Sequence, residues 1–385
     1  MTARAVSDRD LALKSVLIRG VSIVALSTVA LPVGGAAISP AKAQTDRAMD
    51  EVLVTARRRE ERLLDVPISI TTFSSDRLEQ FSARSLADIG NFVPNLFYTD
   101  RSTLQTDITI RGVGGDARNI GIESGIGLYI DGVYAGRTSA YNMDLADIQQ
   151  IEVLRGPQGT LFGKNTTGGA INITTRRPSD EFEVDGLFAY GNFNTFRFAG
   201  SVSGPITDTL SAKLRVATLD RDGYITNEFN GEDVQDEQRR AVLGQLRYQP
   251  NKSWDILLSV DYTVDDRNVI QNQLGSDAAF GAGFFNPDRF VINVDQPNTA
   301  ERDMLGVSLN AVYEFDSGHR LTWISAYRDT EITVFSDIDQ TPNRVFDSGP
   351  FTDNAEQFTQ EIQFASPGNQ FIDYLAGVYF YRQDA

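Results

Sequence analysis

The chain has 385 residues, a formal net charge of −17, no cysteine and a single histidine. The acidic balance argues against nucleic acid as a partner, because phosphate contacts need clustered Lys and Arg. The lack of cysteine excludes disulfides, Cys/His zinc sites and a cysteine nucleophile. The histidine, His319, follows Asp-Ser-Gly, a sequence typical of a tight turn. We therefore predict no enzyme, no catalytic residue, no cofactor and no metal site.

The N-terminal segment carries the signature of export. Four basic residues precede a short apolar run at 21–31, and the small-x-small pattern of a cleavage site lies at 41–43. We expect residues 1–43 to be a signal peptide cut after Ala43, rather than a short membrane anchor. No other long apolar run follows, so a membrane-spanning structure would have to be a closed β-barrel.

Two zones of different composition come next. Residues 44–62 form a short tail, in which the β-prone stretch 50–56 precedes a charged run at 57–62. Such a tail cannot fold alone, but it can add as a strand to the sheet edge of another protein. Residues 63–178 mix short helices with glycine-bounded strands, which predicts a small α+β domain. The expected helices are 75–81 and 85–89, and the expected strands are 108–111, 127–130, 151–154 and 170–174.

Residues 181–385 change to a period of two. About nine segments of roughly ten residues alternate apolar and polar side chains, the length of a tilted membrane-spanning strand. Short turns alternate with long polar connections at 221–238, 266–303 and 330–355. This order favours a transmembrane barrel over a soluble β-sandwich, which has no reason to place its long loops on one side. The segments start near residues 181, 195, 209, 239, 253, 304, 319, 356 and 371.

Several motifs resemble those of the TonB-dependent outer-membrane receptors. The most specific is Ile151-Glu-Val-Leu-Arg-Gly-Pro-Gln-Gly-Thr-Leu-Phe-Gly163, continued by 168–172; the stretches 65–70, 110–114 and 129–134 add to it. The resemblance implies an α+β plug domain at 63–178 followed by an antiparallel transmembrane β-barrel of about twenty-two strands. Because only about nine strands are expected at 181–385, we interpret the sequence as an N-terminal part with an incomplete barrel.

The resemblance also implies a function. Members of the family import a scarce ligand across the bacterial outer membrane, and TonB of the inner-membrane energy complex powers them. The expected partners are TonB, outer-membrane lipid and the ligand. A ferric siderophore or other iron complex is the default ligand, and the alternatives are a vitamin, a carbohydrate or an aromatic compound. A passive porin is a further alternative, and an adhesin or phage receptor could coexist with import. The short gap before residue 50 leaves no space for a signalling domain, so we expect a plain transporter.

Three groups of site residues follow from these motifs. For the TonB-binding strand, or TonB box, we expect Glu51, Val52, Leu53, Val54, Thr55 and Ala56. The plug arginines at two motifs are expected to pair with a barrel-wall carboxylate, since a buried guanidinium needs such a partner. This plug–barrel lock comprises Arg111, Glu152, Arg155 and Glu361. Ligand contacts are expected at plug loop tips, where Arg suits an anionic chelate, although the same residues could simply face solvent: Tyr98, Arg101, Arg118, Asn119, Tyr134 and Arg137.

Overall fold

The structure is a computed structural model, and its described residues all belong to one compact unit, Glu51–Ala385. They are residues 52–55, 57–59, 61–81, 83, 85–100, 106–114, 123–137, 147–269, 286–296, 298–344, 347–368 and 370–385. The expected signal peptide, residues 1–43, lies outside them. Within the described ranges, no helix is long and apolar enough to cross a bilayer.

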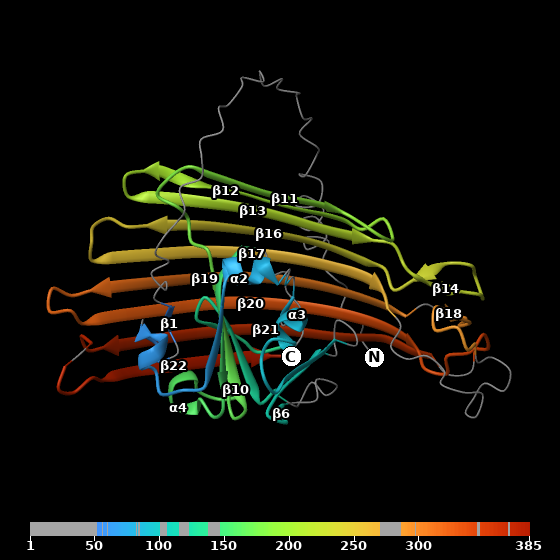
Figure 1. Cartoon of the computed structure of the whole chain (residues 1–385), viewed down its shortest axis with the longest axis horizontal. Helices are drawn as coiled ribbons and strands as arrows, with labels where there is room; N and C mark the ends of the chain where they lie inside the picture. Colours follow the sequence, from blue (N-terminus) through green and yellow to red (C-terminus); the bar gives the residue numbers. More distant parts are fainter. Residues whose placement is uncertain are drawn as a thin grey trace, which may run out of the picture. The chain divides into compact units, whose positions relative to one another are not determined.

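The plug domain is built on a five-stranded mixed sheet (Figure 1). In spatial order its strands are β3 (Ile70–Ser74), β9 (Ile148–Arg155), β10 (Gly169–Thr175), β7 (Ile126–Ile130) and β8 (Val133–Ala135). A second sheet holds β4 (Leu96–Asp100), β5 (Thr106–Ile110) and β6 (Val113–Gly114). The helices are η1 (Leu63–Asp65), α2 (Ser75–Gln80), α3 (Leu86–Gly90) and α4 (Gly159–Phe162).

Local capping explains where the two predicted helices begin. The Ser74 hydroxyl accepts a hydrogen bond from the backbone N–H of Arg77 and so starts α2. The backbone N–H of Ser85 donates to the Asp88 carboxylate at 2.9 Å and starts α3. Both helices lie at the predicted positions.

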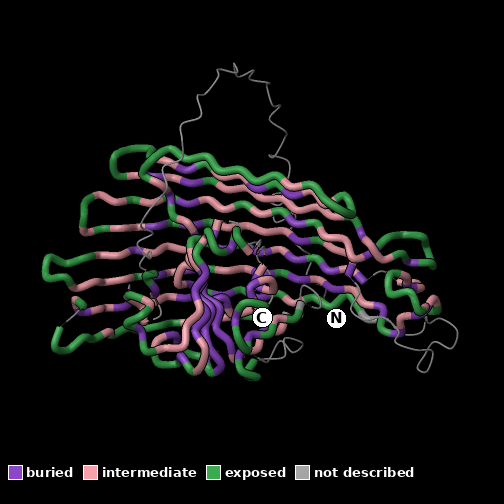
Figure 2. Tube along the Cα trace, viewed as in Figure 1, coloured by how far each residue is buried: buried purple, intermediate pink, exposed green. Residues whose placement is uncertain are grey.

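The strands of the five-stranded sheet are largely buried (Figure 2), and a different hydrophobic cluster lies on each face of the sheet. Alternate residues of a strand point to opposite faces, so Ile151 and Val153 of β9 pack into the core beneath α2 and α3. Leu154 packs on the other face, together with Phe162 and Val54 from the N-terminal tail. Glu152 lies on this second face, and this position decides its role below.

A nine-stranded antiparallel sheet follows, here called the wall (Figure 1). Its strands are β11 (Glu183–Tyr190), β12 (Phe196–Thr207), β13 (Leu210–Arg221), β16 (Glu237–Tyr248), β17 (Trp254–Asn268), β19 (Thr299–Glu314), β20 (Arg320–Asp337), β21 (Asp347–Ala365) and β22 (Leu375–Asp384). The predicted fold class, an α+β domain followed by antiparallel strands, is confirmed. Two small sheets complete the described elements. One pairs β1 (Leu53–Val54) with β2 (Glu61–Arg62), and the other places β14 (Ile225–Asn227) between β15 (Asp233–Val234) and β18 (Val291–Ile292).

The wall has an apolar outer face and an inner face toward the plug. On β17, Leu258 and Val260 are 38% and 42% exposed, whereas the intervening Leu257 and Ser259 are 3% and 6% exposed. The expected period of two therefore places alternate residues on the two faces.

The predicted long connections are shorter than expected. β20 continues to Asp337 and β21 begins at Asp347, so most of the predicted loop 330–355 is strand. The Asp-Ser-Gly-Pro start of β21 has poor strand propensity, yet Ser348 pairs with Ser336 of β20. Pairing with a neighbouring strand overrides weak local propensity here.

Candidate functional site at the tail strand and the plug–wall contact

The tail strand is docked rather than free. β1 pairs with β2 in antiparallel register, and the Leu63 N–H donates to the Val52 carbonyl at 2.9 Å. Val54 is 1% exposed, while its neighbours Val52 and Leu53 are 44% and 48% exposed. The tail therefore buries the Val54 side chain in the plug and leaves Val52 and Leu53 exposed to solvent. Glu51 and Ala56 lie outside the described residues.

Glu152 binds the tail and not the wall. Its carboxylate accepts hydrogen bonds from the Thr55 backbone N–H at 2.7 Å and from the Thr55 hydroxyl at 3.1 and 3.2 Å. The side-chain amides of Gln150 and Asn172 donate at 2.9 and 3.4 Å. Burial raises the pKa of Glu152, and these hydrogen bonds oppose that rise. The expected role of Glu152 in a plug–wall lock is thus corrected, because its side chain is on the sheet face that the tail covers.

The charged run after the tail strand reaches the wall. The Arg58 guanidinium carbon lies 4.4 Å from the ring centre of Phe162 and 5.1 Å from that of Tyr129, and Arg58 Nη2 lies 3.9 Å from Glu361 Oε2. Arg59 lies 3.5 Å from Asp373 in the turn before β22. Cation–π contacts and ion pairs together fix this part of the tail between plug and wall.

The plug meets β21 through direct hydrogen bonds. The Gln357 side chain donates to the Tyr134 carbonyl at 2.7 Å and accepts from the Gly136 N–H at 2.9 Å. A side chain at position 136 would collide with Gln357 and Tyr381, so glycine permits this close approach. Arg137 Nη2 lies 2.7 Å from Asp353 Oδ1, and both side chains are more than four-fifths buried.

Breaking this ion pair should loosen the plug. Arg137→Met leaves the Asp353 carboxylate without that guanidinium, a loss of about 1–3 kcal/mol. We expect a higher ion leak through the full-length protein in planar bilayers. Arg320→Met, which breaks the exposed Arg320–Glu314 pair within the wall, is the control. Equal leak in the two variants would contradict the assignment.

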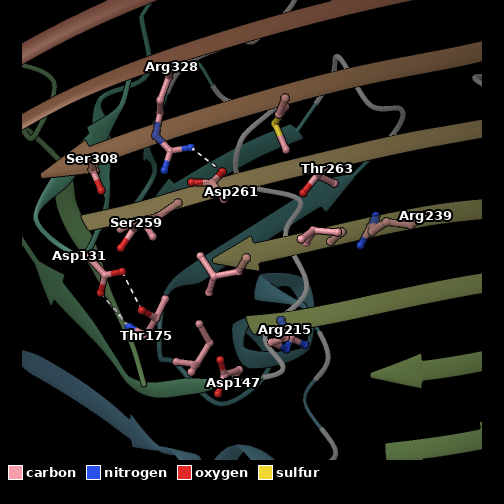
Figure 3. Close-up of a pocket in the computed structure, with 16 residues that line it drawn as sticks. Asp131, Asp147, Thr175, Arg215, Arg239, Ser259, Asp261, Thr263, Ser308 and Arg328 are labelled. Carbon is pink, nitrogen blue, oxygen red and sulfur yellow. Dashed lines mark hydrogen bonds and ion pairs between the residues drawn. The ribbon is translucent and has the colours of Figure 1, made fainter. Parts of the chain in front are cut away.

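A cavity of about 120 Å³ separates the plug from other wall strands (Figure 3). Within the plug, Asp131 accepts hydrogen bonds from the Thr175 N–H at 2.9 Å and hydroxyl at 2.8 Å. On the wall, Arg328 Nη1 lies 3.6 Å from Asp261 Oδ2. Pockets for drug-sized ligands hold about 300–1,000 Å³, so this space is too small for a transported ligand of that size. Its charged lining residues are Asp131, Asp147, Arg215, Arg239, Asp261 and Arg328.

Arg111 and Arg155 do not pair with Glu361. The Arg111 N–H donates to the Asn95 carbonyl at 2.9 Å, and the Arg155 side chain donates to the Pro94 carbonyl at 3.4 Å. Both arginines therefore lie against the turn before β4, while Glu361 faces Arg58. The predicted pairing is corrected, because the segment next to the tail strand occupies the position opposite Glu361.

The predicted ligand contacts are also placed differently. Tyr98 lies in β4 and packs against the plug core, and Tyr134 is 4% exposed in β8. Arg137 pairs with the wall. Tyr98 and Tyr134 therefore lie in strands rather than at loop tips, and a role of the three residues in ligand binding stays a prediction. Arg101, Arg118 and Asn119 lie outside the described residues, so their role remains a prediction.

Sequence reasoning missed Arg58, Gln357 and Asp353 as contact residues. A signal existed for two of them. Gln357 belongs to the polar stripe of β21 that also carries Glu361, and Arg58 belongs to the charged run after the tail strand. Asp353 lies in a stretch with loop-like composition, so nothing local predicted its position on a strand.

Comparisons with known proteins agree with this arrangement. Residues 62–170 match the family model described as TonB-dependent Receptor Plug Domain. The chain is 25% identical over 303 residues to the vitamin B12 transporter of Vibrio vulnificus, covering 75% of this chain and 49% of the relative. It is 29% identical over 271 residues to an iron-regulated outer membrane virulence protein of Vibrio cholerae, covering 65% and 38%. The chain thus spans about half or less of the length of these relatives.

A solved structure gives the same fold. The ferric yersiniabactin uptake receptor of Yersinia pestis superposes with a TM-score of 0.69 at 23% identity, covering 82% of this chain and 48% of that one. The shared fold is a plug domain packed on the inner face of an antiparallel wall. Residues 62–170 thus match the plug domain of TonB-dependent receptors, and the rest of the chain is similar to these proteins in fold.

Proposed function

We propose that this chain serves energised import across the bacterial outer membrane, with a ferric siderophore or another iron complex as the ligand. One observation carries the proposal: a plug docked on the inner face of the wall holds an N-terminal strand whose Val52 and Leu53 remain exposed. Such a strand can add to a sheet edge of TonB in the periplasm. The apolar outer face of the wall suits contact with outer-membrane lipid.

The names of similar proteins support iron as the ligand. One relative is an iron-regulated outer membrane virulence protein, and one structural neighbour is a ferric yersiniabactin uptake receptor. The likeness to a vitamin B12 transporter favours a second candidate, import of a non-iron ligand such as a cobalamin. A passive porin is disfavoured, since the plug contacts the inner face of the wall at Gln357 and Asp353, and Arg58 of the tail contacts it at Glu361.

Uptake by living cells tests the proposal. Iron-starved cells with and without the gene receive radiolabelled ferric yersiniabactin or cyanocobalamin, each with and without a protonophore. We expect gene-dependent uptake of the iron complex that the protonophore abolishes. Gene-dependent uptake of cyanocobalamin alone would shift the ligand to the second candidate. Entry that persists with the protonophore would contradict energised import.

A further inference from the structure

Glu152 is a buried carboxylate whose interaction partners are all neutral. It is 1% exposed and lies on β9, directly opposite Asn172 of β10 and Thr72 of β3. Among the described residues, the groups that stabilise its charge are the donors of Thr55, Asn172 and Gln150. A carboxylate taken out of water needs several such donors, because an unsatisfied buried charge is costly.

The tail supplies part of the donor set around Glu152. Thr55 offers both its backbone N–H and its hydroxyl to the Glu152 carboxylate. Gln150, which donates to Glu152, also donates to the Leu53 carbonyl at 2.9 Å. The tail residues on either side of the buried Val54 are therefore held by side chains of one strand, β9.

We propose that Glu152 is a positioning residue that latches the strand Leu53–Thr55 onto the plug sheet. Its hydrogen bonds set how often this strand leaves the plug and becomes open to a partner protein with a free sheet edge. The latch rests on the geometry of the chain alone, whereas its consequence for a partner rests on the proposed function.

The chemistry of the latch makes it reversible. When the tail leaves, the face of the sheet that carries Glu152 opens to water, and water replaces the donors of Thr55. Release therefore leaves no buried charge without a partner.

The mobility of a spin label on the tail strand reports directly whether Glu152 holds this strand on the plug. The chain has no cysteine, so a spin label on Val52→Cys reports one site, and Val52 is exposed enough to carry it. The receptor is labelled in its native membrane and the ratio of mobile to immobile signal is recorded. Glu152→Gln removes the charge that the Thr55 N–H stabilises, and it replaces the oxygen that accepts from the Asn172 amide by a second donor. We expect the mobile-to-immobile ratio to rise about tenfold or more.

Three further variants separate the latch from a general loss of plug structure. Thr55→Val removes only the hydroxyl, so we expect a smaller rise, and no additional rise on the Glu152→Gln background. Asp131→Asn is the matched control: Asp131 also accepts from a threonine N–H and hydroxyl, at 2.9 and 2.8 Å, but Thr175 is not in the tail. A second label on Thr99→Cys in β4 reports the plug itself and should not change.

The outcomes separate the latch from the proposed function. An immobile tail in Glu152→Gln would overturn the latch, as would equal mobilisation by Asp131→Asn or a mobile label at position 99. Binding of the purified periplasmic domain of TonB to the unaltered receptor and to Glu152→Gln is measured separately. We expect the variant to bind about tenfold more tightly, because more of its tail is open. A mobilised tail with no TonB binding to either protein would support the latch and overturn the proposed partner.

Discussion

Leu53→Pro should reduce ligand uptake to the level of cells that lack the receptor. Leu53 lies in β1, and its backbone must pair with any sheet edge that captures the tail. Proline has no N–H to donate and is excluded from central strands of a sheet. A partner protein would bind the tail through backbone hydrogen bonds. A proline at this position removes one of these hydrogen bonds, whereas other side-chain substitutions leave them intact. We expect at least about a tenfold loss of uptake.

The measurement compares uptake with ligand binding at the cell surface. Leu53→Pro should keep surface binding of the radiolabelled ligand and lose only the energised step. Leu53→Val is the matched control, since it alters the same side chain but keeps the N–H and the strand propensity. Normal uptake by Leu53→Pro would contradict the role of this strand.

Val260→Arg should block assembly of the receptor in the membrane. Val260 lies at the middle of β17 on the outer face and is 42% exposed. An arginine facing lipid near the bilayer midplane costs about 2–4 kcal/mol in a membrane barrel. We expect the amount of folded receptor in the outer membrane, followed by its heat-modifiable mobility on gels, to fall severalfold.

A charge on the opposite face of the wall is the control. Ser308 of β19 lines the cavity between plug and wall, where Asp261 also lies. Ser308→Arg therefore adds the same side chain toward water and a carboxylate. Assembly at normal levels is expected for this variant, and an equal defect in both would contradict the assignment of the two faces.

The period of two and the glycine-bounded motifs predicted most of the fold. Each of the nine wall strands begins within nine residues of its expected start. Apolar and polar residues alternate along a strand because its two faces meet different surroundings, so the alternation indicates where each strand lies. The largest error, at Asp347, arose where strand pairing and not composition extends the sheet. The helices at 75–80 and 86–90 could be predicted because serine caps mark their starts.

The site could be predicted less well, because its contacts join residues far apart in the chain. Nothing in the sequence around Glu152 shows that its face of the plug sheet is the one covered by Thr55, 97 residues earlier. Likewise, Glu361 has the polar environment expected of a lock residue, but its partner depends on how the tail crosses the plug. The sequence therefore indicated that Glu152 and Glu361 would have polar partners, but the identity of each partner follows only from the folded structure.

Quenching of tryptophan fluorescence tests the central claim, that the outer face of the wall contacts lipid around the plug. The two tryptophans of the chain, Trp254 and Trp323, lie on β17 and β20 and are 36% and 44% exposed. In vesicles with brominated acyl chains, we expect strong quenching of both and little effect of aqueous iodide. Quenching by iodide with no response to brominated lipid would show that these side chains face water, and it would contradict the account.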